Sequence, residues 1–210
     1  MEVIASSRRP KTRWSRVNMR VLDLGCGDGL TPHKLNLPSS WQIIGLDVKF
    51  GALSKAHINF PHRAFVCSAA ERLPFPASSF DRVISNVALP YMDIPKALTE
   101  IYRVLAPGGT LLASLHPLSF TLAELRKALP KPKAALYRVW VLSNGIVFHV
   151  AGRNFGEAFQ TERGIRIALQ RANFAGVSFR HDSKRWFVEA SKQLETRPSA
   201  MRDSNLAAAS

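Results

Sequence analysis

The chain has 210 residues, 46% of them hydrophobic, and a formal net charge of +14. This length and apolar content suit one domain with a buried core and exclude a disordered chain. Cys26 and Cys67 are too few for a disulfide framework or a thiolate zinc site, so no metal is expected and a reducing, cytoplasmic location is favoured. No run approaches the roughly 18 consecutive apolar residues of a membrane-spanning helix, so no transmembrane segment is expected.

The positive charge is unevenly distributed along the chain. Residues 1–20 carry six basic side chains against one acidic, residues 21–120 carry eight against seven, and residues 121–192 carry thirteen against five. Such asymmetry favours an anionic partner: nucleic acid, an acidic membrane surface or an anionic substrate. A solvated basic surface that only keeps the protein in solution is the alternative explanation.

Short apolar runs alternate with helical patterns through the first half of the chain. Nearly continuous apolar strands separated by helices indicate a parallel sheet that is covered on both faces. Right-handed crossovers then make the fold a doubly wound α/β sheet. The expected elements, in chain order, are strands at 20–24, 42–47, 64–67, 80–85 and 110–115, with helices at 32–37, 52–58 and 93–105.

The segment after the fifth strand is predicted to contain a helix and a β-hairpin. Residues 120–129 have a helical pattern that ends at prolines. Asn144-Gly145 separates two apolar runs, 136–142 and 146–150. Because Asn-Gly adopts the positive φ angles of a type I′ turn, these runs are expected to pair as a hairpin.

The last part of the domain is predicted to be a helix followed by two strands. Thr161 can cap a helix with apolar residues at helical spacing, and residues 177–181 and 186–190 have the pattern of strands. The chain contains no internal repeat that would indicate a second domain. The predicted organisation is a basic flexible arm at 1–18, one domain at 19–192 and a tail at 193–210.

A glycine-rich loop follows the first predicted strand. The sequence Asp23-Leu24-Gly25-Cys26-Gly27-Asp28-Gly29 lets the backbone approach a ligand closely at a strand-to-helix turn. Its spacing is G-x-G-x-G, whereas dinucleotide-binding dehydrogenases use G-x-G-x-x-G. Asp23 would repel a pyrophosphate and attract an ammonium. The loop therefore favours a ligand with a cation and disfavours a nicotinamide cofactor.

A second carboxylate, Asp47, ends the second predicted strand. It lies about 20 residues beyond the loop, where an acid can accept hydrogen bonds from both ribose hydroxyls. An amino-acid ammonium and a ribose together describe S-adenosylmethionine.

At these residues the chain resembles the class I S-adenosylmethionine-dependent methyltransferases, most closely the small ubiquinone/menaquinone-biosynthesis-like group of the Methyltransf_11 type. The resemblance covers residues 19–117, about half of the chain. It implies a Rossmann-like, seven-stranded, mostly parallel sheet with an antiparallel last strand, and an acceptor-binding insertion at 118–160. Beyond the loop, the motifs that carry it are Ala70-Glu71-Arg72-Leu73-Pro74-Phe75, Ser79-Phe80-Asp81 and residues 101–109, Ile-Tyr-Arg-Val-Leu-Ala-Pro-Gly-Gly.

The resemblance also implies which residues bind the cofactor. The implied set is Asp23, Gly25, Cys26 and Gly27 around the methionine moiety, Asp47 at the ribose, Val48, Ala69 and Ala70 at the adenine, and Asn86 at the methionine amino group. The chain departs from the family where Ala69 replaces the usual acid and where Pro90-Tyr91 replaces a frequent histidine pair.

Methyl transfer needs a base only when the acceptor keeps its proton at neutral pH. His116 after the fifth strand and Tyr91 after the fourth are the candidates for this role. For each of them, packing or ordinary hydrogen bonding is the alternative role.

Three functions are compatible with these patterns. The first is methyl transfer by in-line displacement to a small acceptor, anionic if the basic residues of 118–160 contact it. The second is methylation of RNA or DNA, which is less favoured because Asn86 to Tyr91 lacks the Asn-Pro-Pro-Tyr pattern of base-nitrogen methyltransferases. The third is a catalytically silent cofactor-binding protein. The sequence leaves the acceptor atom and the oligomeric state open.

Overall fold

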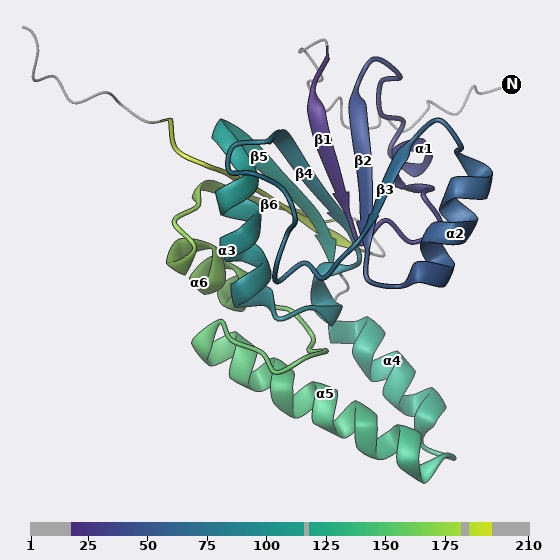
Figure 1. Cartoon of the computed structure of the whole chain (residues 1–210). Helices are drawn as coiled ribbons and strands as arrows, with labels where there is room; N and C mark the ends of the chain where they lie inside the picture. The colour runs from purple at the N-terminus through teal and green to yellow at the C-terminus, as the bar shows by residue number, and fades with distance from the viewer. Residues whose placement is uncertain (1–17, 116–117, 182–184, 195–210) are drawn as a thin grey trace, which may run out of the picture.

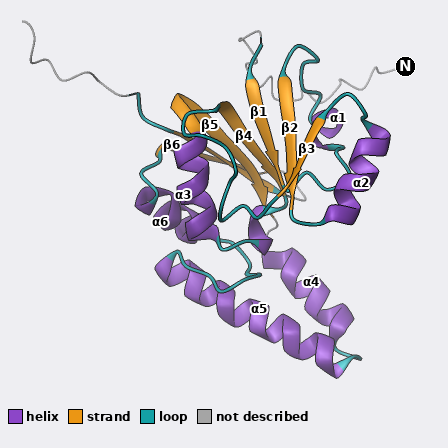
Figure 2. Cartoon of the chain, viewed as in Figure 1, coloured by secondary structure: helices purple, strands orange, loops and turns teal. Residues whose placement is uncertain are grey.

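The computed structural model describes residues 18–115, 118–181 and 185–194 (Figure 1). They form a seven-stranded sheet that is flanked by helices, with two further helices packed below the carboxyl ends of the parallel strands (Figure 2). The strands are β1 (Arg20–Leu24), β2 (Gln42–Asp47), β3 (Ala64–Cys67), β4 (Phe80–Asn86), β5 (Leu105–Leu115), β6 (Ala175–His181) and β7 (Trp186–Ser191). The helices are α1 (Thr31–Lys34), α2 (Phe50–Asn59), the 3₁₀ turn η1 (Leu89–Tyr91), α3 (Ile94–Val104), α4 (Leu118–Ala128), α5 (Pro132–Ala151) and α6 (Glu162–Arg171).

The strand order confirms the predicted fold class. The sheet has the order β3-β2-β1-β4-β5-β7-β6. The first five strands pair in parallel, whereas β7 is antiparallel to both β5 and β6. The chain order reverses at β1, between β2 and β4, and ligands of doubly wound sheets bind at the carboxyl ends of strands beside such a switch point.

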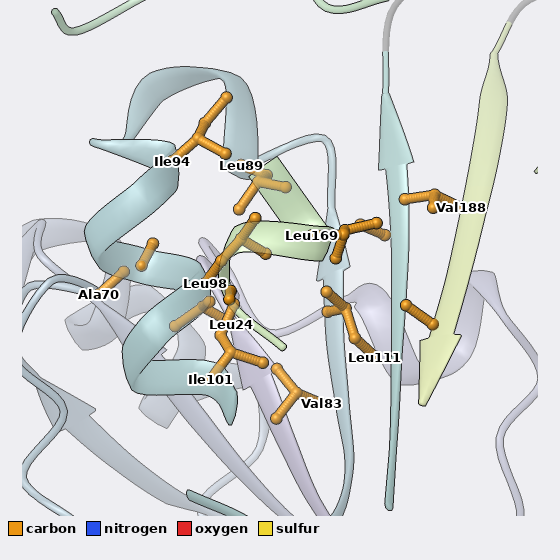
Figure 3. Close-up of a cluster of buried hydrophobic side chains, with 14 of the residues drawn as sticks. Leu24, Ala70, Val83, Leu89, Ile94, Leu98, Ile101, Leu111, Leu169 and Val188 are labelled. Atoms are coloured by element: carbon orange, nitrogen blue, oxygen red, sulfur yellow. The ribbon is translucent and has the colours of Figure 1, made fainter. Parts of the chain in front are cut away.

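The largest core cluster lies between the sheet and α3 (Figure 3). Asp93 begins α3 by accepting a hydrogen bond from the backbone N of Lys96 at 3.2 Å, and Pro95 lies in the first turn, where its missing N–H costs nothing. The buried side chains of α3 recur at helical spacing, so one face of the helix packs against the strands. They are Ile94, Ala97, Leu98, Ile101 and Val104.

The predicted β-hairpin at 136–150 is wrong, because these residues belong to the 20-residue helix α5. Asn144 and Gly145 lie on its buried face. The Asn144 side chain donates to the backbone O of Glu157 at 2.9 Å and accepts from the backbone N of Phe155 at 3.0 Å. Gly145 leaves room for the ring of Phe159, which a Cβ would approach to 2.0 Å. Tertiary contacts thus stabilise Asn144-Gly145 in a helix, although the local preference of this dipeptide is a turn.

Helix α5 bears on the expectation that no segment spans a membrane, which stays a prediction. Among the described residues, it is the one helix that is long and apolar enough to cross a membrane, judged by length and composition alone. Only 22% of its most apolar window is buried inside the protein. Lys133 and Arg138 interrupt the apolar runs in the sequence, which is why the run length did not reveal it.

Candidate cofactor site

A cavity of about 380 Å³ opens at the carboxyl ends of β1 and β2. This volume is within the range of small-molecule sites, and the position is the one expected for a doubly wound sheet. Its walls come from the glycine loop, the end of β2, the segment after β3 and the turn η1. The lining residues are Gly25, Gly27, Leu46, Asp47, Val48, Lys49, Ala52, Ser68, Ala69, Ala70, Glu71, Ala88, Tyr91 and Met92.

Two glycines shape the loop for different reasons. Gly25 has a φ of +73°, and a Cβ there would lie 2.2 Å from the Cβ of Ala88, so the loop and the segment after β4 touch at this point. Gly27 has a φ of +56°, and a Cβ there would meet nothing within 4 Å. Because Gly27 also lines the cavity, the absence of a side chain leaves open space for a ligand beside the backbone.

Asp47 is fixed by the backbone on two sides. Its Oδ2 accepts a hydrogen bond from the N of Gly27 at 2.9 Å, and its Oδ1 accepts one from the N of Lys49 at 2.9 Å. A carboxylate has about four lone-pair sites, so these two bonds orient it and leave acceptor capacity toward the cavity. A ribose diol matches that remaining capacity.

Asp23 lies beneath the loop and is not on the cavity wall as described. Its side chain belongs to the core, with a residue exposure of 2%, and its Oδ1 has no hydrogen-bond partner within the described structure. Burial raises the pKa of Asp23 to about 7, against a smaller lowering effect of the hydrogen bond with Thr31. A buried carboxyl oxygen without a partner is compatible with a nearby cation, and the predicted role of Asp23 at the ammonium stays a prediction.

We expect the ionisation of Asp23 to make stability fall as the pH rises. Because the folded pKa of about 7 is above the ordinary 3.8, the native state binds more protons than the unfolded state between these values. Relative to the Asp23→Asn variant, the unmutated protein should lose stability from about pH 4 to about pH 7 and change little above that. Urea unfolding of both proteins across this range measures the difference. A difference that is independent of pH would contradict the assignment.

The wall opposite the loop contains both predicted and unpredicted residues. Val48, Ala69 and Ala70 line the cavity as the sequence predicted, and Val48 is 65% exposed, which leaves its face available for a planar ring. The adjacent Glu71 was missed, although it lies within a motif that carried the resemblance. Its Oε1 accepts a hydrogen bond from the backbone N of Asp93 at 2.8 Å and so ties this wall to the start of α3.

Asn86 and Cys26 are not on the cavity wall as described. The Oδ1 of Asn86 accepts hydrogen bonds from the hydroxyl of Ser114 at 2.7 Å and from the guanidinium of Arg185 at 3.2 Å. Cys26 is buried, and burial together with nearby Asp23 raises the pKa of its thiol to about 12. Its side chain is therefore a neutral packing group at physiological pH.

Of the two candidate bases, the structure describes one. Tyr91 lies in η1, lines the cavity and is 56% exposed. Burial of part of the side chain, followed by the charge of Glu157, raises the pKa of its phenol. A phenol with a raised pKa stays protonated at neutral pH and is better suited to donate a hydrogen bond than to remove a proton. His116 lies outside the described residues.

These features fit S-adenosylmethionine. The oriented carboxylate of Asp47 suits the ribose, the open space at Gly27 admits a ligand against the backbone, and Val48 with the two alanines offers an apolar wall for adenine. Within the described ranges, no three His, Cys, Asp or Glu side chains come together in a way that could hold a metal ion.

Comparison with known proteins finds likeness over the part of the chain that contains this cavity. A family model described as a methyltransferase domain matches residues 22–113. A malonyl-[acyl-carrier protein] O-methyltransferase of Methylovorus sp. is 41% identical over 120 residues, which cover 51% of this chain and 40% of that protein. A mitochondrial arginine-hydroxylase of Rattus norvegicus is 34% identical over 109 residues, covering 51% of this chain and 32% of that protein. The chain thus spans less than half of the length of either relative.

A solved structure extends the likeness of the fold to most of the chain. The S-adenosylmethionine-dependent methyltransferase from Methanosarcina mazei superposes with a TM-score of 0.62 at 22% identity, covering 86% of this chain and 95% of that one. At this identity the agreement concerns the fold. Residues 22–113 thus match the methyltransferase-domain family model, and the fold around them is that of this solved methyltransferase.

Proposed function

We propose that the protein transfers a methyl group from S-adenosylmethionine to a small acceptor that carries an anionic group, most simply a carboxylate. The observation that supports this proposal best is the pairing of the oriented Asp47 with the open Gly27 cradle in one cavity. We also propose that it acts in the cytoplasm, where the free thiols Cys26 and Cys67 would stay reduced.

The main contribution of the chain to the reaction is to position the cofactor and the acceptor, and it adds little to their chemical reactivity. When bound, S-adenosylmethionine supplies a methyl group that its sulfonium already activates. Asp47 and the backbone at Gly27 would fix the ligand, and rigid placement of two reactants in line accounts for a large part of such a rate. Met92 and Tyr91 border the cavity from η1 and the residue after it, where they can exclude water and orient an acceptor. A carboxylate acceptor is already ionised at neutral pH, so its methylation needs no base.

The acceptor would meet a polar cluster next to Tyr91. Arg138 of α5 pairs with Glu157 at 2.9 Å and with Glu124 of α4 at 3.9 Å. The hydroxyl of Tyr137 donates to Glu157 at 2.6 Å. The backbone N of Ala158 donates to the O of Pro90 at 3.4 Å, so the segment that carries Glu157 lies beside η1 and the cavity residue Tyr91. The relative that is named for methylating a malonyl group favours an acidic acceptor for this chain as well.

Two measurements test the proposal in sequence. Calorimetry with S-adenosylhomocysteine should give one bound ligand per chain. Transfer of labelled methyl from S-adenosylmethionine to a panel of carboxylic acids and their thioesters, a malonyl thioester included, should then label at least one acid far above its matched amide. Failure to bind S-adenosylhomocysteine would exclude the enzyme, whereas binding without transfer to any acceptor would support a silent cofactor-binding protein.

Nucleic-acid methylation is the alternative that the basic charge keeps open. If RNA or DNA were the acceptor, several phosphate contacts would make log K fall steeply with log salt concentration. A small acceptor predicts weak RNA binding and no labelled RNA. Labelled RNA whose yield falls with the same salt dependence would overturn the small-acceptor proposal.

A further inference from the structure

Helix α5 lies on the outside of the protein, below the sheet in the view of Figure 1, and several of its apolar side chains are exposed. These residues fall into two groups, 136–140 and 146–150, which lie on the same face of the helix because they are about two turns apart, with the exposed Ser143 between them. Leu136, Ile146 and Val150 are 72%, 61% and 63% exposed. An isolated exposed leucine needs no explanation, but a row of this length on one helix marks an interaction surface. The α5 stripe comprises Leu136, Val139, Trp140, Ile146, Val147 and Val150.

The other side of α5 is held by the rest of the protein. Val141, Asn144, Gly145 and Phe148 are buried, and Asn144 is hydrogen-bonded to the backbone of residues 155–157. Phe148 belongs to the main core cluster and is 0% exposed. Removing α5 from this packing would leave Asn144 without partners and empty part of the core. The helix is long enough to span a bilayer, but its inner face is packed against the protein. Only the stripe is exposed for contact with a partner.

Cations surround the start of α5. Arg126 and Lys127 end α4, and Lys131 and Lys133 stand at the beginning of α5, all of them exposed. The acids of segment 118–160, Glu124 and Glu157, both pair with Arg138. Among the described side chains, the cations at 126, 131 and 133 form no ion pair, so this end of the helix presents net positive charge next to the apolar stripe.

We propose that the protein docks on an anionic lipid bilayer through the α5 stripe, with the basic residues at the α4–α5 turn against the headgroups. A helix with an apolar face, flanking cations and an interfacial Trp lies in the plane of the membrane interface. Docking of a second copy would cover the stripe, but it would add further cations and would not neutralise those already there. Anionic lipid neutralises those cations and buries the stripe at the same time.

The test is sedimentation of the full chain with vesicles of phosphatidylcholine, with and without phosphatidylglycerol. We expect binding to the anionic vesicles that decreases as salt is added. Leu136→Asp and Val147→Asp should each weaken binding by about tenfold or more, since each removes a large apolar side chain from the interface. Lys131→Gln and Lys133→Gln should each weaken it by about fivefold, the worth of one basic residue near an anionic surface.

Ile58→Asp is the matched control, because Ile58 is 78% exposed on α2, outside the stripe. It should bind as the unmutated protein does, and circular dichroism should show that all variants keep their helices. Unmutated protein that does not bind anionic vesicles overturns the proposal. So does equal binding by Leu136→Asp, which would assign lipid binding to other basic residues. A dimer that Leu136→Asp converts into monomers would assign the stripe to a second copy. None of these outcomes depends on methyl transfer, so the two proposals can fail separately.

Discussion

Replacing Gly145 by alanine is expected to lower the free energy of unfolding by about 2 kcal/mol, the cost of overpacking a core. In an exposed helix interior the same change normally stabilises by up to about 1 kcal/mol. The sign reverses here because the new methyl group would lie 2.0 Å from the Cδ1 of Phe159 and 2.3 Å from its Cε1. Phe159 is itself buried, so its ring has little room to move away.

Urea unfolding at equilibrium measures this effect, and Ser143→Ala provides the control. Ser143 precedes Asn144 on the same helix but is exposed. Its replacement should leave stability within about 0.5 kcal/mol of the unmutated protein or raise it slightly, as helix propensity predicts. Gly145→Ala that is as stable as Ser143→Ala would show that α5 and the segment at Phe159 are less closely packed than described.

Asp47→Ala is expected to weaken the binding of S-adenosylhomocysteine by roughly 100-fold, or about 3 kcal/mol. Two hydroxyl-to-carboxylate hydrogen bonds would be lost, each worth about 1.5–3 kcal/mol in favourable cases and not fully additive. The substitution also frees the N of Gly27, which Asp47 holds at 2.9 Å in the loop. The loss should therefore be in affinity, with the fold retained.

Asp28→Ala is the matched control, because it also removes one carboxylate, from an exposed position of the glycine loop outside the cavity wall. Its affinity for S-adenosylhomocysteine should stay within about twofold of the unmutated value, since an exposed charge contributes little. Calorimetry of the unmutated protein, Asp47→Ala and Asp28→Ala separates a specific contact with the ribose from a general effect of charge. An equal loss of affinity in both variants would indicate a general effect of charge and would contradict the proposed contact of Asp47 with the ribose.

The elements that follow from local sequence were predictable. Short apolar runs located β1 to β4, and Asp93 and Thr161 begin their helices as capping residues should. Helix α5 was not predictable in the same way. Its Asn144 and Gly145 satisfy contacts with residues 155–159 that no window of neighbouring sequence contains.

The residues of the candidate site likewise divide into those that local sequence predicts and those that tertiary packing places. Asp47, Gly25 and Gly27 were predicted because strand ends and glycine spacing fix their places, and the cavity includes all three. Glu71 and Met92 were missed because their position on the wall depends on how η1 and the segment after β3 approach each other. The burial of Asp23 beneath the loop depends on the packing around β1, and its expected role at the ligand stays a prediction.

The contact between Gly25 and Ala88 limits how the protein can be re-engineered. The Cβ of Ala88 occupies the space that a side chain at position 25 would need, so the loop on the cofactor side and the chain leading to Tyr91 are built around one shared methyl group. A designer who enlarges residue 88 to reshape acceptor specificity will displace the glycine loop and weaken cofactor binding in the same step. Libraries aimed at new acceptors should keep alanine or glycine at position 88 and vary Tyr91 and Met92 instead.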